Sequence, residues 1–301
     1  METIQSLFNL RQPNAPQVRL GDLISNTKIG VEVEVENLPN PPSINGWKCT
    51  RDGSLRNNGV EYVFKGPVGG LSACNRLASL QNTLFETECV HTLRTSVHVH
   101  VDARDMTWHQ VKELLILYAI VEPYLFSICG TERADNIYAL SLYRGQHQVS
   151  QLCDILEGGH ELINRRWTKY TALNLTALST FGSLEFRGHR GTCSKDVLVN
   201  WINHLLKLKE YVMNPRTSVT HFPNMMSSQG PHAVLSAIFG EDLVNANISQ
   251  FVGIEDVMYE SIWIAENLIH NSPMLYHHNE IKRNNNGHSQ LEKVKDKLCA
   301  V

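Results

Sequence analysis

Glutamates alternate with valines in residues 30–36, where the sequence reads GVEVEVE. Successive side chains of a strand point to opposite faces, so the valines share one face and Glu32, Glu34 and Glu36 share the other. Carboxylates placed this close together raise one another's cost of ionisation, and a divalent cation would turn that repulsion into coordination. An ordinary amphipathic strand that faces water is the alternative interpretation.

Histidines repeat this alternation in residues 95–102, which read TSVHVHVD. The valines take one face of the predicted strand, and His98, His100 and Asp102 take the other. Two imidazoles and a carboxylate on one strand face suit a metal or phosphate site. Surface histidines, or histidines satisfied within the core, are the alternative.

Two more carboxylates follow the first strand. Asp52 opens the turn sequence DGSL, in which an aspartate either ligates a cation or stabilises the turn itself. Glu61 lies in a predicted strand at residues 60–64, on the face opposite Tyr62.

The fourth segment, residues 183–192, reads SLEFRGHRGT. Its apolar residues are predicted to face the core, and Glu185, Arg187 and His189 are predicted to face the opposite side. A solvated intrastrand pair of Glu185 and Arg187 is the alternative, and it would stabilise the fold little. If the four strands join one sheet, its carboxylate-rich face favours Mg²⁺ or Mn²⁺ over zinc. Metal ions and arginines together would suit a polyphosphate.

Helices are needed to position these strands. Apolar residues at helical spacing predict them at residues 70–87, 107–130, from Ser194 to 208, and at 254–270. Long insertions separate the strands, so we expect an antiparallel or mixed sheet with the helices segregated to one side. This is the α+β class.

Bulk composition narrows the classes of function. The 301 residues fit one large domain or two modest ones, and 42% hydrophobic residues are ample for a core. A net charge of −3 makes nucleic acid an unexpected partner. The 7 cysteines are dispersed, and neither a secretory signal nor a membrane-spanning stretch is visible, so the sequence predicts a soluble cytoplasmic protein.

The ordered set of GVEVEVE, DGSL with GVEYV, TSVHVHVD, RRWTKYTALNL and SLEFRGHRGT resembles the amidoligase family of glutamine synthetase–like carboxylate–amine ligases. The resemblance extends from about residue 29 to about residue 201. It implies a curved, mostly antiparallel sheet of the glutamine synthetase catalytic type, with helices packed on one side. It places a catalytic domain at residues 28–270, between a lead-in at 1–27 and a polar tail at 271–301.

The resemblance also implies roles for individual residues. Asp52 and Glu61 match an acidic pair that helps to position the incoming amine, and Arg187 matches an arginine that steadies the transferring phosphoryl group. Arg133, Tyr138, Arg166, Tyr170 and Asn174 fit the pattern more loosely, with a structural role or a substrate contact left open, and Glu36 has no counterpart. The implied metal ligands are Glu32, Glu34, Glu61, His98 and Glu185; the implied catalytic residues are Arg187, Asp52 and Glu61; and the implied cofactor-binding residues are His100, Arg187, Arg166 and Arg190.

The activity implied by the resemblance is ATP-dependent amide-bond formation with Mg²⁺ or Mn²⁺. A carboxylate, either a small molecule or a peptide, would be activated as an acyl phosphate and joined to an amine, in a protein that is monomeric or oligomeric. Three alternatives remain open: a metal-dependent hydrolase that uses His98 and His100, a kinase of the same fold, and a non-catalytic descendant that acts as a binding module.

Overall fold

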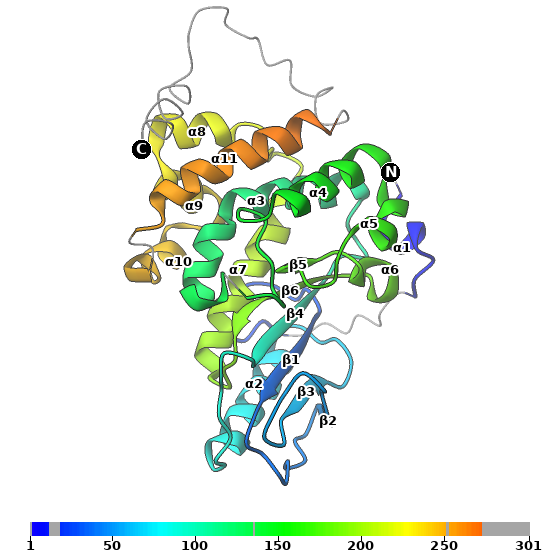
Figure 1. Cartoon of the computed structure of the whole chain (residues 1–301), viewed down its shortest axis with the longest axis vertical. Helices are drawn as coiled ribbons and strands as arrows, with labels where there is room; N and C mark the ends of the chain where they lie inside the picture. The colour runs from blue at the N-terminus through cyan, green and yellow to red at the C-terminus, as the bar shows by residue number, and fades with distance from the viewer. Residues whose placement is uncertain (1, 12–18, 135, 251–252, 273–301) are drawn as a thin grey trace, which may run out of the picture.

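A six-stranded antiparallel sheet organises the chain in the computed structural model, which describes residues 2–11, 19–134, 136–250 and 253–272 (Figure 1). Its strand order is β2-β3-β1-β4-β6-β5, so β1 and β4 lie at the centre. The strands are β1 (Ile29–Val35), β2 (Trp47–Thr50), β3 (Val60–Phe64), β4 (Ser96–Asp102), β5 (Leu173–Asn174) and β6 (Ser183–Arg190). Neighbouring strands pair antiparallel throughout, and the prediction of an α+β fold is confirmed.

The predicted alternation of faces is present in the two central strands. The β1 valines and the β4 valines are at most 1% exposed. The register places Glu32 of β1 opposite His98 of β4, and Glu34 of β1 opposite Glu61 of β3. Because residues opposite each other in a ladder share a face, the acidic residues and histidines come together on the other side.

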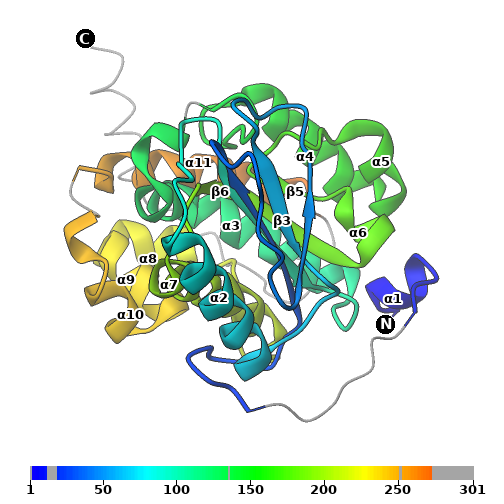
Figure 2. The same ribbon diagram turned by 90° about the horizontal axis from the view of Figure 1, so that it is seen from below.

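Three helices cover the apolar face of the sheet, as Figure 2 shows for α2, α3 and α7. The predicted capping box of Thr107 and Gln110 is present at the start of α3, and Ser194 occupies the N-cap of α7 without a side-chain capping bond. Further helices surround these three, with α11 packed on α3. The α-helices are α1 (Ile4–Leu7), α2 (Gly70–Phe85), α3 (Trp108–Cys129), α4 (Gln146–Gly158), α5 (Ile163–Arg166), α6 (Ala177–Phe181), α7 (Lys195–Met213), α8 (Phe222–Gln229), α9 (Pro231–Phe239), α10 (Glu241–Asn245) and α11 (Glu255–His270).

A β-bulge in β6 corrects one prediction about its faces. Val99 pairs with Phe186 but Val97 pairs with His189, so two residues of β6 lie opposite the single residue His98. The extra residue reverses the alternation beyond Arg187. His189 therefore faces the core, fully buried against Trp201, and its predicted place on the polar face is wrong.

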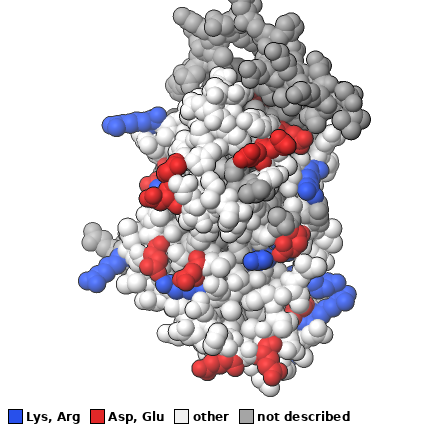
Figure 3. Space-filling model, turned by 90° about the vertical axis from the view of Figure 1, so that its left-hand side faces the viewer, with Lys and Arg blue, Asp and Glu red and all other residues white. Residues whose placement is uncertain are grey.

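The start of the chain is attached to the body of the protein. Ile4 is fully buried, and its backbone N–H donates to the carbonyl of Met106 at 2.8 Å. The predicted tail lies outside the described residues except at its first two positions, 271 and 272. Among the described helices, none has both the length and the apolar character needed to span a bilayer. On the face drawn in Figure 3, described basic side chains are interspersed with acidic ones, so this face has no continuous basic surface.

Candidate metal and phosphate site

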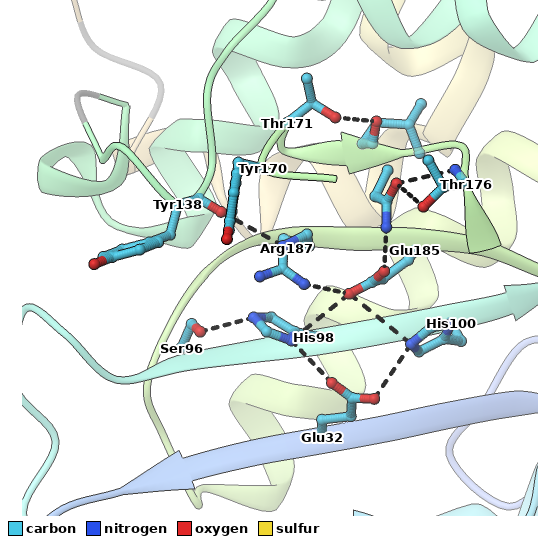
Figure 4. Close-up of polar contacts among 12 residues, drawn as sticks. Glu32, Ser96, His98, His100, Tyr138, Tyr170, Thr171, Thr176, Glu185 and Arg187 are labelled. Atoms are coloured by element: carbon cyan, nitrogen blue, oxygen red, sulfur yellow. Dashed lines mark hydrogen bonds and ion pairs between the residues drawn. The ribbon is translucent and has the colours of Figure 1, made fainter. Parts of the chain in front are cut away.

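The polar face of the sheet gathers predicted ligands from β1, β4 and β6, as Figure 4 shows, and Glu61 of β3 joins them. Three overlapping groups each bring three ligand atoms within 4.8 Å of one another. The groups are Glu32, Glu61 and His98; Glu32, His100 and Glu185; and Glu34, Asp52 and Glu61. Since the groups share Glu32 and Glu61, they form one continuous cluster.

Glu32 and Glu185 lie on either side of the two histidines. Glu32 Oε2 is 2.9 Å from His98 Nδ1, and its Oε1 is 3.4 Å from His100 Nε2. Oε1 of Glu185 lies 3.7 Å from His98 Nδ1 and 4.0 Å from His100 Nε2. Oε1 of Glu185 therefore faces both imidazoles, although His98 and His100 belong to different three-ligand groups.

Ser96 determines which nitrogen of His98 is protonated. Its backbone N–H and its hydroxyl both lie 2.7 Å from Glu34 Oε2, and the hydroxyl is also 2.8 Å from His98 Nε2. A carboxylate only accepts, so the single hydroxyl proton goes to Glu34 and Nε2–H of His98 donates to the hydroxyl. Nδ1 of His98 then reaches Glu32 either through a second ring proton, as a hydrogen bond, or through a metal ion.

Glu185 is held in place from both sides. Asn174 of β5 donates from Nδ2 to Oε2 at 2.6 Å, and Arg187 donates from Nη1 to Oε1 at 2.6 Å. The amide oxygen of Asn174 in turn accepts from the backbone and hydroxyl of Thr176. These contacts fix the carboxylate plane with Oε1 directed at the cluster.

Carboxylates crowd the other end of the cluster. Burial, followed by repulsion from Glu32, Glu34 and Asp52, raises the pKa of Glu61 to about 8. Asp52 stabilises the turn as predicted, because its Oδ1 accepts from the Ser54 N–H at 2.7 Å, and it also belongs to one of the three acidic groups that could hold a cation. A divalent cation would relieve this repulsion.

The histidines have the opposite electrostatic effect. Burial alone would raise the pKa of Glu32, but hydrogen bonds from His100 and His98 outweigh it and lower that pKa well below its usual range. Burial alone would lower the pKa of His100, and its contacts with Glu32 and Glu185 raise it instead. The cluster thus holds opposite charges together within a buried space.

A cavity of about 250 Å³ opens at the His100 end of the cluster. Gly30 lies on its floor beside His100, where an added Cβ would be 3.4 Å from the His100 Cβ. Phe181 also lines the cavity, and its ring contacts His100 edge-on with ring centroids 5.8 Å apart. A glycine inside a strand often marks the close approach of a ligand.

Several sequence candidates lie outside the cluster. Glu36 is buried, and it accepts from the backbone N–H of Arg56 at 2.7 Å and from Thr92 at 3.0 Å, so it holds two loops together. Arg190 is 60% exposed and lies 4.0 Å from Glu132. Arg166 ends α5 and makes no ion pair with the described residues of the cluster.

The loosely matched residues divide into two kinds. Asn174 contacts Glu185 directly, whereas the hydrogen bonds of the Arg133 side chain to described residues go to backbone carbonyls of β6. Tyr138 and Tyr170 contact each other with ring centroids 6.0 Å apart, and Figure 4 shows both beside Arg187. Both rings are more than one-third exposed, so they are free to contact a ligand near Arg187.

Sequence reasoning missed Ser96 and the cavity. Ser96 continues the polar alternation two residues before His98, so the same pattern could have identified it. Gly30 likewise shares the face of Glu32. Phe181 carries no local signal, because it meets His100 only after the chain folds.

Comparison of the chain with family models and with curated proteins gives no match. The amidoligase resemblance therefore remains an expectation from the motifs. The geometry itself fits hard divalent cations, since oxygen donors from Glu32, Glu34, Asp52, Glu61 and Glu185 outnumber the two imidazoles. Such a cluster beside an arginine can bind phosphate oxygens and neutralise the charge that develops on them.

Proposed function

We propose that this protein is an ATP-dependent carboxylate–amine ligase that uses Mg²⁺ or Mn²⁺. The observation that carries the proposal is the meeting of four strands' acidic residues and histidines in one cluster, with Arg187 at its edge. A hydrolase would use His98 and His100 with one carboxylate. It would leave the crowded group of Glu34, Asp52 and Glu61 without a function.

The proposed reaction has two steps. The substrate carboxylate attacks the γ-phosphate of ATP, which forms an acyl phosphate and releases ADP; the amine then attacks the acyl carbon and displaces phosphate. Bound cations would neutralise the phosphate oxygens and align them for in-line transfer. Within the chain, Arg187 approaches the same oxygens from β6 and compensates charge on the transferring group.

The remaining residues bind and orient the reactants. The cavity beside His100 is a suitable place for the nucleoside of ATP, because it joins an apolar space to the end of the cluster. At the opposite end, Asp52 or Glu61 would accept a proton from the attacking amine. We predict that Asp52→Asn lowers the yield of amide per ADP released, and an unchanged yield would rule out Asp52 as this acceptor.

The test is a screen for ADP release with Mg²⁺ or Mn²⁺ across pooled acids and amines. Glu185→Gln is the inactive variant, since it removes a charge from the centre of the cluster. Glu36→Gln is the matched control. Like Glu185, Glu36 is a buried glutamate at a strand, but its carboxylate accepts from the described residues Arg56 and Thr92, outside the cluster. We expect ADP release that needs both an acid and an amine, is lost in Glu185→Gln and is kept in Glu36→Gln.

Each alternative gives a different result. A kinase would release ADP with a stable phosphorylated product and no need for an amine. Hydrolysis without nucleotide would indicate a hydrolase, and failure to bind Mg–nucleotide would indicate a non-catalytic module. Equal ADP release from the wild type and Glu185→Gln would contradict the proposed site itself.

A further inference from the structure

Arg133 is a buried charge whose partners are unusual. Its side chain belongs to the loop that follows α3, and the residue is only 2% exposed. It makes no ion pair with any described residue. The charges of Glu34 and Glu132 act on it only from a distance, and burying a guanidinium without a direct ion pair is costly, so its hydrogen bonds need an explanation.

Both of those hydrogen bonds go to the bulge of β6. Arg133 Nε donates to the carbonyl of Gly188 at 3.1 Å, and its Nη2 donates to the carbonyl of Arg187 at 3.2 Å. Arg187 and Gly188 are the two residues that lie opposite the single His98. A bulge disrupts the ladder and leaves backbone groups to be satisfied elsewhere, and Arg133 supplies two donors at this point.

The Arg187 side chain leaves β6 at the bulge. Regular alternation from Glu185 already places Arg187 on the polar face, and the bulge directs His189, two residues later, into the core. The backbone N–H of Arg187 donates to Ala172 at 2.8 Å, which anchors the strand on its other side. The backbone of Arg187 is therefore held on one side by Ala172, just before β5, and on the other by Arg133.

The loop after α3 also contacts the guanidinium of Arg187. Nε of Arg187 donates to the carbonyl of Tyr138 at 3.4 Å, and its Nη1 donates to Glu185. Tyr138 lies five positions after Arg133 along the chain. One loop thus contacts Arg187 at its backbone and at its guanidinium.

We propose that Arg133 is a positioning residue, which orients the Arg187 guanidinium toward the cluster by bracing the bulge and does not itself touch the substrate. The catalytic part of this inference rests on the proposed function, whereas the geometric part does not. Removal of Arg133 should therefore disturb Arg187 even when no ligand is bound.

The first experiment follows Arg187 without any ligand. The Nε–H signal of Arg187 is assigned in nitrogen-15 spectra by its loss in Arg187→Lys, and its hydrogen exchange is compared among variants. In Arg133→Met the exchange should become about three- to tenfold faster, because a hydrogen bond of ordinary strength is lost. Lys112→Met is the matched control: Lys112 is also a buried cation that donates to a carbonyl, that of Leu156, away from the cluster. Unchanged exchange in Arg133→Met would overturn the proposal.

The second experiment is a double-mutant cycle on ADP release. Arg133→Met should lower kcat by about 10- to 100-fold in the wild type, as is typical when the support of a catalytic group is removed. In an Arg187→Met background the same change should lower it by less than about twofold, because the two residues act as one unit. Losses that multiply fully would show that Arg133 acts independently of Arg187.

The two experiments separate the possible failures. If the wild type neither binds nor consumes nucleotide, the proposed function fails, and the exchange rate of Arg187 still decides whether Arg133 positions it. If Arg133→Met does not fold, Arg133→Lys replaces it in both experiments, since a lysine retains one donor to the bulge. It should give an intermediate exchange rate, and a rate equal to that of the wild type would count against the proposal.

Discussion

Glu122 should make the stability of this protein depend on pH. It lies on α3, fully buried, and one carboxylate oxygen accepts from the Tyr143 N–H at 2.9 Å. Burial raises the pKa of Glu122 from 4.5 to about 8, and the hydrogen bond from Tyr143 offsets only part of that effect. At neutral pH the folded protein therefore holds a proton that the unfolded chain has released.

The sign and size of the effect follow from this difference. A pKa that is raised on folding contributes stability that is fully present below about pH 4.5 and is lost as the pH rises through about 8. Within that window the free energy of unfolding falls by about 1.4 kcal/mol per pH unit. From about pH 5.5 to about pH 7.5 the loss is roughly 2.7 kcal/mol, against a total of roughly 5–15 kcal/mol for a typical domain.

Urea unfolding of the wild type and Glu122→Gln at both pH values tests this reasoning. Glutamine keeps an acceptor for Tyr143 but cannot ionise. We compare the free energy of unfolding of Glu122→Gln minus that of the wild type at the two pH values. This difference should be larger by about 2.7 kcal/mol at about pH 7.5 than at about pH 5.5. The raised pKa values of Glu61 and Glu113 affect both proteins equally and cancel in this difference. Parallel pH profiles for the two proteins would refute the argument.

Three other predictions concern the polar face. Gly30→Val places methyl groups in the cavity beside His100, so nucleotide affinity in calorimetry should fall about tenfold or more, since overpacking costs about 1–3 kcal/mol; an unaffected affinity would place the nucleotide elsewhere. Asn174→Ala removes the donor to Glu185 and should weaken Mn²⁺ binding by about 10- to 100-fold, while Ser179→Ala, which removes a nearby surface hydrogen bond, should not. Glu36→Ala leaves the Arg56 N–H and the Thr92 hydroxyl without their acceptor, so the free energy of unfolding in urea should fall by about 1–3 kcal/mol for each donor. A fall in this free energy no greater than that of Glu36→Gln would contradict this.

The faces of the main strands could be predicted from the sequence because alternation is a local property. Valines at every second position of β1 and β4 determine which side enters the core, and Glu32, Glu34, His98 and His100 follow from that. The α+β class follows from the same strands together with the helical spacing between them.

The bulge could not be predicted in this way. Residues 183–189 alternate regularly in sequence, and only the pairing of β6 with β4 and the donors from Arg133 reveal where the alternation breaks. Two short strands were missed for a related reason. β5 has two residues and β2 has four, so each is too short to carry a periodic signal and depends on its neighbour in the sheet.

Because four separate strands contribute to one cluster, ligand binding should stabilise the folded protein against unfolding and proteolysis. Its ligand atoms come from segments that span half the chain, so any partly folded form that has lost one of the four strands has lost part of the cluster. A ligand that binds this face at about 100 times its Kd would stabilise the entire sheet by about 2.7 kcal/mol through mass action. Proteases cleave unfolded chains, so a higher concentration of that ligand in the cell would lengthen the protein's lifetime. When the ligand is scarce, the molecules that lack it would be degraded first.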